Sequence, residues 1–325
     1  MNQDRRYLLN VGAASALGSM CPQLATAAAY PERPVRVFVG FPAGGGADML
    51  TRIICDWLRS RLGQAFVVEN RPGAATNLAT EAVARAPADG YTLLATTTSN
   101  LLNGALFPDL RYDFLRDIAP VASVSIQPLV LEAGPEASAR TLAAFIAEAK
   151  ARPGKLNVGH FGNGTISHLA AEALKLQAGI DFLTVPYRGS APMLIDLLGG
   201  RIDAAIDNIP GSIEHLRSGR LQALAVTTST RSEALPGTPA LAELVPGFEA
   251  YAIAGIGAPA ATPLDVIRKL NAEINAGLAD VAVKERMSAL GVTLLPGAPA
   301  DFAKRLAVET EKWARVIKLV GIKPS

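Results

Sequence analysis

Short apolar runs alternate with amphipathic stretches along the first third of the chain, from Tyr30 onward. The apolar runs are VRVFVGF, AFVVEN and YTLLATT, and helical periodicity lies between them at residues 48–62 and 77–85. RPG at 71–73 and APADG at 86–90 are typical turn signals. Apolar strands separated by amphipathic helices predict an α/β fold with mainly parallel sheets.

A second series of the same kind follows a long apolar run, IAPVASVSIQPLVLEAG, that has no helical period. Helices are predicted at 141–151, 165–178 and 190–198, between the strands KLNVGHF, FLTVPY and IDAAIDN. Another extended run, LQALAVTTSTR, comes next, and two helices at 263–278 and 299–317 end the pattern.

The two long runs, near 120–131 and 221–230, bracket a block of about one hundred residues, a typical domain size. We expect them to be crossover strands between two lobes. Lobe 1 would be discontinuous, residues 30–123 plus 230–325, and lobe 2, residues 124–229, would be inserted into it. A cleft between two lobes can hold a small ligand and close by hinging.

The first 29 residues differ in texture from the rest. An arginine pair, Arg5 and Arg6, precedes a small, weakly apolar segment with Ala-x-Ala options at Ala27 and Ala29. This predicts a signal peptide cleaved near Ala29, with a frayed N-terminal helix as the alternative. The arginine pair resembles a twin-arginine signal, so the Sec and twin-arginine routes both stay open. No later run reaches the roughly 18 apolar residues of a membrane span, and we expect a soluble periplasmic protein.

Composition and charge restrict the possible partners. The chain of 325 residues is 50% hydrophobic and 18% charged, with a net charge of +2, which suits a folded core and not disorder. Without a basic block, nucleic acid is not an expected partner, and we expect a monomer. Removing the leader with Cys21 leaves Cys55 as a packed thiol and no internal disulfide.

Glycine-rich turns stand where predicted strands end and helices begin. They are FPAGGGADML at 41–50, PGAATNLA at 72–79, FGNGTISH at 161–168 and YRGSAPML at 187–194. Ligands of open α/β sheets bind at such strand ends, where a helix start offers unpaired N–H groups and a positive dipole end. Each loop alone could be an ordinary turn, but two in each lobe predict an anion cleft.

Side chains near these loops suggest caps more than catalysis. Asp48, Asn77, Thr165 and Ser190 suit helix starts, and the Lys-Ser/Thr pair of a phosphate loop is missing. The histidines, His160, His168 and His215, lack metal-site spacing, and no Gly-x-Ser-x-Gly elbow occurs. No metal or cofactor is therefore expected. His160 follows a strand beside a glycine loop, as a ligand contact or a structural histidine.

Together, VRVFVGFPAGGGADMLTR, VVENRPGAATNLATEAVARAPADGYTLL, PGKLNVGHFGNGTISHLAAEALK and VPYRGSAPMLIDLLGGRIDAAIDN resemble the Bug family of tripartite tricarboxylate transporter substrate-binding proteins, over nearly the whole mature chain. The resemblance implies a two-lobed, type II periplasmic-binding-protein-like fold without catalytic activity. It implies a small carboxylate or related organic ligand and a membrane permease that receives it. The ligand-binding residues it implies are Ala43, Gly44, Gly45, Gly46, Ala47, Asp48, Ala75, Thr76, Asn77, Thr97, Thr98, Ser99, His160, Phe161, Gly162, Asn163, Gly164, Thr165, Tyr187, Arg188, Gly189, Ser190, Asp207 and Asn208.

The chain departs from the family pattern at four places around the expected cleft. Ala47 stands where the family often has Thr, and Ala75-Thr76 where it often has Gly-Gly. His160-Phe161 replaces a small polar pair, and Ile253-Ala254 an aromatic pair. We hypothesise that the cleft wall has moved, which favours a ligand unlike the usual dicarboxylates. The alternatives are an enzyme on the same scaffold, with His160 as general base, and a ligand sensor for a membrane signalling partner.

Overall fold

The structure is a computed structural model that describes residues 30–322. The predicted signal peptide and its cleavage near Ala29 lie outside the described residues. The chain divides into two units, residues 1–32 and 33–325, and the second contains the helices and strands. Among the described residues, the helices fall short of the length and apolar character that a membrane span requires.

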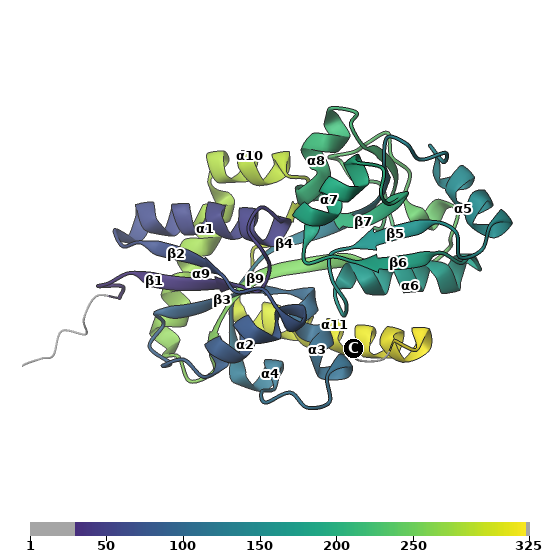
Figure 1. Ribbon diagram of the computed structural model, residues 1–325. Helices are drawn as coiled ribbons and strands as arrows, with labels where there is room; N and C mark the ends of the chain where they lie inside the picture. The colour runs from purple at the N-terminus through teal and green to yellow at the C-terminus, as the bar shows by residue number, and fades with distance from the viewer. Residues whose placement is uncertain (1–29, 323–325) are drawn as a thin grey trace, which may run out of the picture. The chain divides into compact units, whose positions relative to one another are not determined.

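The first strand group follows the predicted alternation of strands and helices. Strand β1 (Val35–Val39) pairs in parallel with β2 (Phe66–Asn70) and β3 (Thr92–Thr97). Helix α1 (Gly46–Leu62) connects β1 to β2, and α2 (Asn77–Ala84) connects β2 to β3. Figure 1 shows α1 and α2 on opposite sides of these strands, so apolar residues of β1 and β3 are buried between them.

The second strand group repeats this arrangement. Strand β5 (Asn157–His160) pairs in parallel with β6 (Leu183–Pro186) and β7 (Ala204–Asn208). The helices of this group are α5 (Leu142–Ala151), α6 (Ile166–Ala178) and α7 (Ser190–Leu198). Its core gathers the apolar faces of strands and helices, with Leu131, Phe145, Val158, Leu169, Phe182 and Ile206 in one buried cluster.

A single long strand, β4 (Ile118–Ala133), connects the two groups. Its first part pairs with β9 (Tyr251–Pro259), which also pairs with β3, and its last residues pair with β7. The strand order is β2-β1-β3-β9-β4-β7-β5-β6, with β8 (Gln222–Val226) and β10 (Thr293–Leu294) also paired to β4. These central pairs are antiparallel, because β9 runs back against the direction of β3 and β4.

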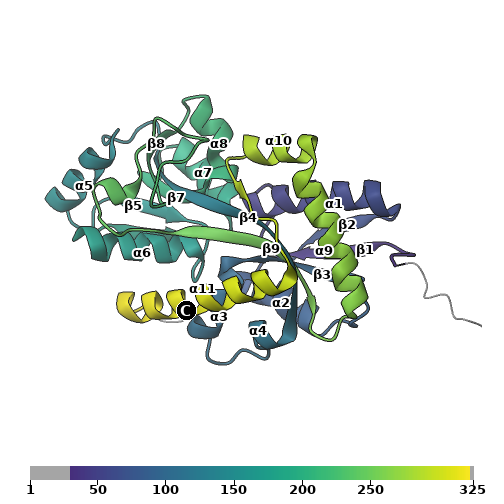
Figure 2. The same ribbon diagram turned by 180° about the vertical axis from the view of Figure 1, so that it is seen from behind.

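The segment that returns alongside β4 is β9 rather than residues 221–230. Strand β8 pairs only with the end of β4 in the described sheet, and the chain after it stays in the second group. Val226 bridges to Ala240, and Leu241 and Phe248 belong to the same buried cluster as Leu131. Figure 2 shows β4 and β9 side by side between the two groups. The proposed lobe boundaries stay a prediction.

Other elements complete the unit. Helix α11 (Pro299–Val320) packs against α3 (Thr98–Leu106) of the first group and α6 of the second. Helix α3 and several further elements were not predicted from the sequence. They are η1 (Ala74–Thr76), α4 (Phe114–Asp117), α8 (Ile209–Arg217), η2 (Leu241–Glu243) and α10 (Val281–Ala289). Helix α9 (Leu264–Ala279) lies close to the predicted 263–278.

Candidate functional site

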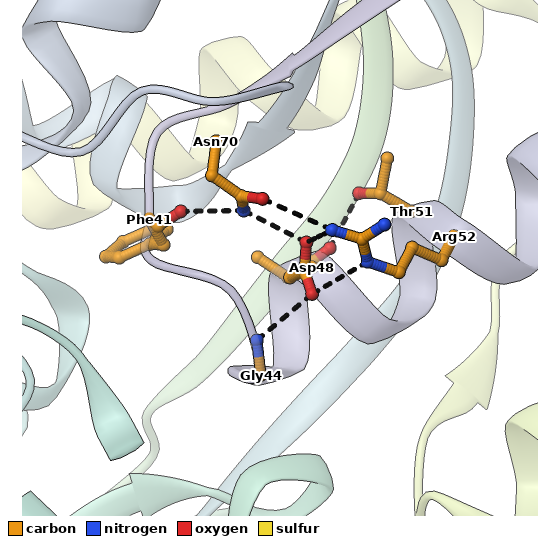
Figure 3. A network of polar contacts seen from close by, with 7 residues as sticks. Phe41, Gly44, Asp48, Thr51, Arg52 and Asn70 are labelled. Atoms are coloured by element: carbon orange, nitrogen blue, oxygen red, sulfur yellow. Dashed lines mark hydrogen bonds and ion pairs between the residues drawn. The ribbon is translucent and has the colours of Figure 1, made fainter. Parts of the chain in front are cut away.

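The glycine loop between β1 and α1 is held by one carboxylate. Asp48 was predicted as the N-cap, but Gly45 occupies that position and Asp48 lies in the first turn. From there its side chain reaches back to accept from the Gly44 N–H at 3.0 Å, and it accepts from Asn70 at 2.9 Å (Figure 3). Arg52 forms an ion pair with it at 2.9 Å. The prediction failed because an acid in the first turn satisfies the same kind of donor as a cap.

The same polar network fixes the charge of Asp48 and the start of the loop. Burial by itself would raise the pKa of Asp48, but hydrogen bonds from Arg52, Gly44 and Asn70 hold it below its usual value. Asn70 also donates to the Phe41 carbonyl at 3.0 Å. The loop is therefore fixed on both sides of its glycines, while the first N–H groups of α1 have no partner within the helix.

A second glycine loop, before α7, lies directly against the first. Gly189 is the N-cap of α7 with φ of 108°, which favours glycine. A Cβ built on Gly189 would lie 3.1 Å from Pro42, and one built on Gly45 would lie 3.9 Å from the Ser190 Oγ. Two helix N-termini thus meet across the boundary between the strand groups, which places two sets of backbone N–H groups around one point.

A small cavity of about 20 Å³ lies between these loops. Its volume has room for about one water molecule, and an organic acid needs more. Phe41 and Phe161 form one wall, with ring centroids 5.8 Å apart in an edge-to-face arrangement. The Asn208 Oδ1 is buried without a partner among the described residues. The lining residues are Phe41, Pro42, Ala43, Gly45, Gly46, Ala47, Phe161, Gly189, Ser190, Ala191 and Asn208.

Asp207 does not line this cavity, but it holds Ser190, which does. It is 0% exposed, and its Oδ1 accepts from the Ser190 hydroxyl at 2.6 Å and from the Asn208 N–H at 2.8 Å. Sequence reasoning missed its neighbour Glu132, also 0% exposed, whose only signal was one acid in an apolar strand. The Ser212 Oγ lies 2.7 Å from Glu132 Oε1 and 3.2 Å from Asp207 Oδ2. Burial raises the pKa of both carboxyl groups.

His160 does not line the cavity, although its neighbour Phe161 does. Its ring is 1% exposed, stacks on His168 at 4.5 Å between centroids, and places Nδ1 3.0 Å from the Gly162 carbonyl oxygen. Burial, with His168 beside it, lowers the pKa of His160 to about 3, so the ring is neutral at physiological pH. His168 accepts from the Gly164 N–H at 3.2 Å and so caps its own loop.

The remaining candidate residues divide between the loop tips and the interior. Thr165 is the N-cap of α6, as expected, while Asn77 begins α2 after the left-handed residues of η1. Ala75 lies 3.5 Å from a Cβ built on Gly164, so these two loop tips meet. Thr97, Thr98 and Ser99 are buried at the start of α3, where the Thr98 Oγ1 accepts from the Ile253 N–H. Tyr187 donates to Asp196, and Arg188 is exposed.

Two of the departures from the family pattern meet at one place. Ala47 and Ala254 both line a second cavity of about 10 Å³, together with Thr97. The volume of this cavity is at the lower limit of what one water molecule requires. Within residues 30–322, no group of three or more His, Cys, Asp and Glu side chains could hold a metal ion.

The fold and the facing helix starts identify an α/β protein of the periplasmic-binding-protein type. Solved structures of other proteins have the same fold. The structure of Rpa4515 of R. palustris with adipate superposes with a TM-score of 0.88 at 36% identity, covering 91% of this chain and 100% of that one. MatC of Rhodopseudomonas palustris with bound malate gives 0.84 at 32% identity, covering 89% and 100%.

Sequence comparison gives the family. The family model described as tripartite tricarboxylate transporter family receptor matches residues 50–322. Protein BugT of Bordetella pertussis is 40% identical over 297 residues, which cover 90% of this chain and 91% of that protein. The chain belongs to the tripartite tricarboxylate transporter receptor family, as its sequence motifs indicated. This is a family of transporter receptors and not of enzymes.

Proposed function

We propose that this chain, exported to the periplasm, captures a small organic carboxylate between the two strand groups and delivers it to a tripartite tricarboxylate-type permease. The observation that supports this most is the pair of glycine loops that bring the N-termini of α1 and α7 together. Backbone N–H groups there would bind the acidic end of the ligand, and the glycines leave room for it.

Ligand entry requires the two groups to separate. The cavity of about 20 Å³ is too small for an organic acid. The strands β4 and β9 connect the groups, and bending there would open the cleft by hinging. We infer that the ligand binds an open form and that closure brings the two sets of N–H groups onto it.

The apolar wall favours a ligand with an apolar part. Phe41 and Phe161 contribute ring edges and faces to the cavity, and the Asn208 Oδ1 offers an acceptor without a protein partner among the described residues. Adipate and malate, present in the two solved relatives, are natural first probes. The wall suggests that acids with a longer alkyl or aromatic body bind more tightly than malate.

Thermal unfolding of the chain from Tyr30 with a panel of acids tests the proposal. The panel contains malate, adipate, a tricarboxylate, benzoate and the matching amides. A ligand at 100 times its dissociation constant should add about 2.7 kcal/mol to the free energy of unfolding, a clear shift in melting temperature. Stabilisation by an acid and not by its amide would support the proposal. No shift with any acid, with mass spectrometry showing no co-purified acid, would contradict it.

A further inference from the structure

Two carboxyl groups lie buried together behind the second glycine loop. Glu132 comes from β4, where it stands opposite Ala205 of β7 and Ala223 of β8, and Asp207 is the penultimate residue of β7. Ser212 of α8 lies between them, and all three side chains are 0% exposed. Binding of an anion by backbone N–H groups makes no use of Glu132, and a buried acid is costly without a purpose or a partner.

Counting hydrogens shows what this arrangement requires. The Ser212 hydroxyl carries one hydrogen, yet its oxygen lies within hydrogen-bond distance of both Glu132 Oε1 and Asp207 Oδ2. Asp207 already receives hydrogens from the Ser190 hydroxyl and the Asn208 N–H. The Glu132 Oε2 is buried with no partner among the described residues. Each contact holds one hydrogen if one of the two carboxyl groups keeps a proton. Asp207, which already accepts hydrogens from Ser190 and Asn208, is the group better stabilised as an anion, and this leaves the proton to Glu132.

We propose that Glu132 is protonated in the folded protein and that it donates through Ser212 to an ionised Asp207, which thereby positions Ser190 in the ligand site. The chain of donors runs from Glu132 to Ser212 to Asp207, while Ser190 donates to the other Asp207 oxygen. Glu132 touches no ligand, so it is a positioning residue. Its link to ligand binding rests on the function proposed above, and its protonation does not.

The charges around Glu132 agree with this assignment. Burial raises the pKa of Glu132 well above its usual range, and the neighbouring Asp207 raises it further. Asp207 is the charged group that faces it from β7. Helix α8 presents the neutral Ser212, and β8 presents Ala223 opposite it. Two ionised carboxylates on one hydroxyl would repel each other in a low-dielectric interior, so one proton is retained.

The consequence for the site is a dependence on pH. While Glu132 carries its proton, Ser190 keeps its hydrogen on Asp207 and presents its oxygen and backbone N–H near the cavity. Once Glu132 ionises, Ser212 turns its hydrogen toward Glu132 and Asp207 loses a donor. A group with a raised pKa stabilises the fold below its unfolded value and loses that contribution as pH rises through the folded value. The free energy of unfolding should therefore fall at alkaline pH, and the affinity for the ligand should fall with it.

Infrared difference spectroscopy with Glu132→Gln tests the protonation directly. The wild-type protein at pH 7 should show the carbonyl band of a buried un-ionised carboxylic acid, and Glu132→Gln should lack it. The surface variant Glu148→Gln, whose side chain bonds Arg152 and Ser138, is the control and should keep the band. Absence of the band from wild type, or its persistence in Glu132→Gln, would overturn the assignment.

Titration of adipate separates the positioning role from the proposed function. Between pH 6 and pH 9, the affinity of wild type for adipate should fall about tenfold, which corresponds to the loss of one hydrogen bond. The affinity of Glu132→Gln for adipate should be constant across this pH range, because its amide still donates to Ser212. Glu132→Leu should bind adipate weakly at every pH. Equal profiles for wild type and Glu132→Gln would contradict the positioning role. If adipate binds none of them, the choice of ligand fails, and the infrared band still decides the protonation.

Discussion

Replacing Asp48 by Asn tests whether this carboxylate holds the first glycine loop. In the structure it accepts from the Gly44 N–H at 3.0 Å, from Asn70 at 2.9 Å and from Arg52 at 2.9 Å, with its side chain 4% exposed. An asparagine keeps one acceptor oxygen and turns the other into a donor. Whichever way the amide lies, an NH₂ group then faces the Gly44 N–H or the Asn70 amide.

The expected cost follows from the burial of each contact. A hydrogen bond to a charged group contributes about 1.5–3 kcal/mol, and an unsatisfied buried donor costs about as much. The Arg52 side chain is 49% exposed, so its ion pair adds only about 0.3–0.5 kcal/mol. We expect Asp48→Asn to lower the free energy of unfolding by about 2–3 kcal/mol.

Urea unfolding at pH 7 measures this change, and acidification adds a second check. Because the pKa of Asp48 is lowered, its contribution is present above the unfolded pKa of about 3.9 and is lost as pH falls below it. The difference between wild type and Asp48→Asn should therefore shrink on acidification. Asp56→Asn, on the same helix with its side chain 54% exposed, is the control and should change stability little. Equal stability of Asp48→Asn and wild type at pH 7 would refute the reasoning.

Three further predictions concern other residues of the unit. Gly45→Val should weaken adipate binding at least tenfold but change the free energy of unfolding by about 1 kcal/mol or less, since Gly45 has an extended backbone and an uncrowded Cβ position. The control is Gly237→Val, whose Cβ position is also uncrowded. Parallel losses of binding and stability in Gly45→Val would argue against the site. Cys55 is 4% exposed, and burial raises the pKa of its thiol to about 12. It should therefore resist a thiol reagent at pH 8 until the chain from Tyr30 unfolds. Rapid labelling of the native protein would contradict its packing. His160→Ser should change the ratio of benzoate to malate affinity by loosening the support of Phe161. In wild type this ratio should be constant from pH 6.5 to 8, where both acids are fully ionised and His160 is neutral. An unchanged ratio in the variant would mean that His160 has no part in selectivity.

Elements with local start and stop signals were predictable from the sequence. Helix α7 has the predicted bounds because Gly189 precedes it and Gly199 follows it. Strand β4 was visible as a long apolar run without helical period. In contrast, α3 and α8 begin directly after β3 and β7 with no intervening turn. Their start signals, Thr97 with Asn100 for α3 and Asn208 with a following proline for α8, coincide with the strand ends and were therefore missed.

The rest depends on contacts between distant residues. The return along β4 was assigned to residues 221–230 because β8 is apolar, but strand pairing decides the partner and β9 takes that place. The glycine loops were recognised by composition, whereas their meeting across Gly189 and Pro42 needed the tertiary structure. Glu132 was passed over because one acid in an apolar strand has no meaning until Ser212 and Asp207 are seen beside it.

The amide NMR spectrum of the glycine loops tests the central claim most directly. The chain from Tyr30, labelled with ¹⁵N, would be titrated with the acid that stabilises it most. We expect the largest shifts at the N–H groups of Gly45, Gly46 and Ser190, with Gly237 unchanged as the internal control. Shifts confined to residues away from both loops, with these amides unmoved at saturation, would contradict the claim that backbone N–H groups at the two helix starts bind the carboxylate.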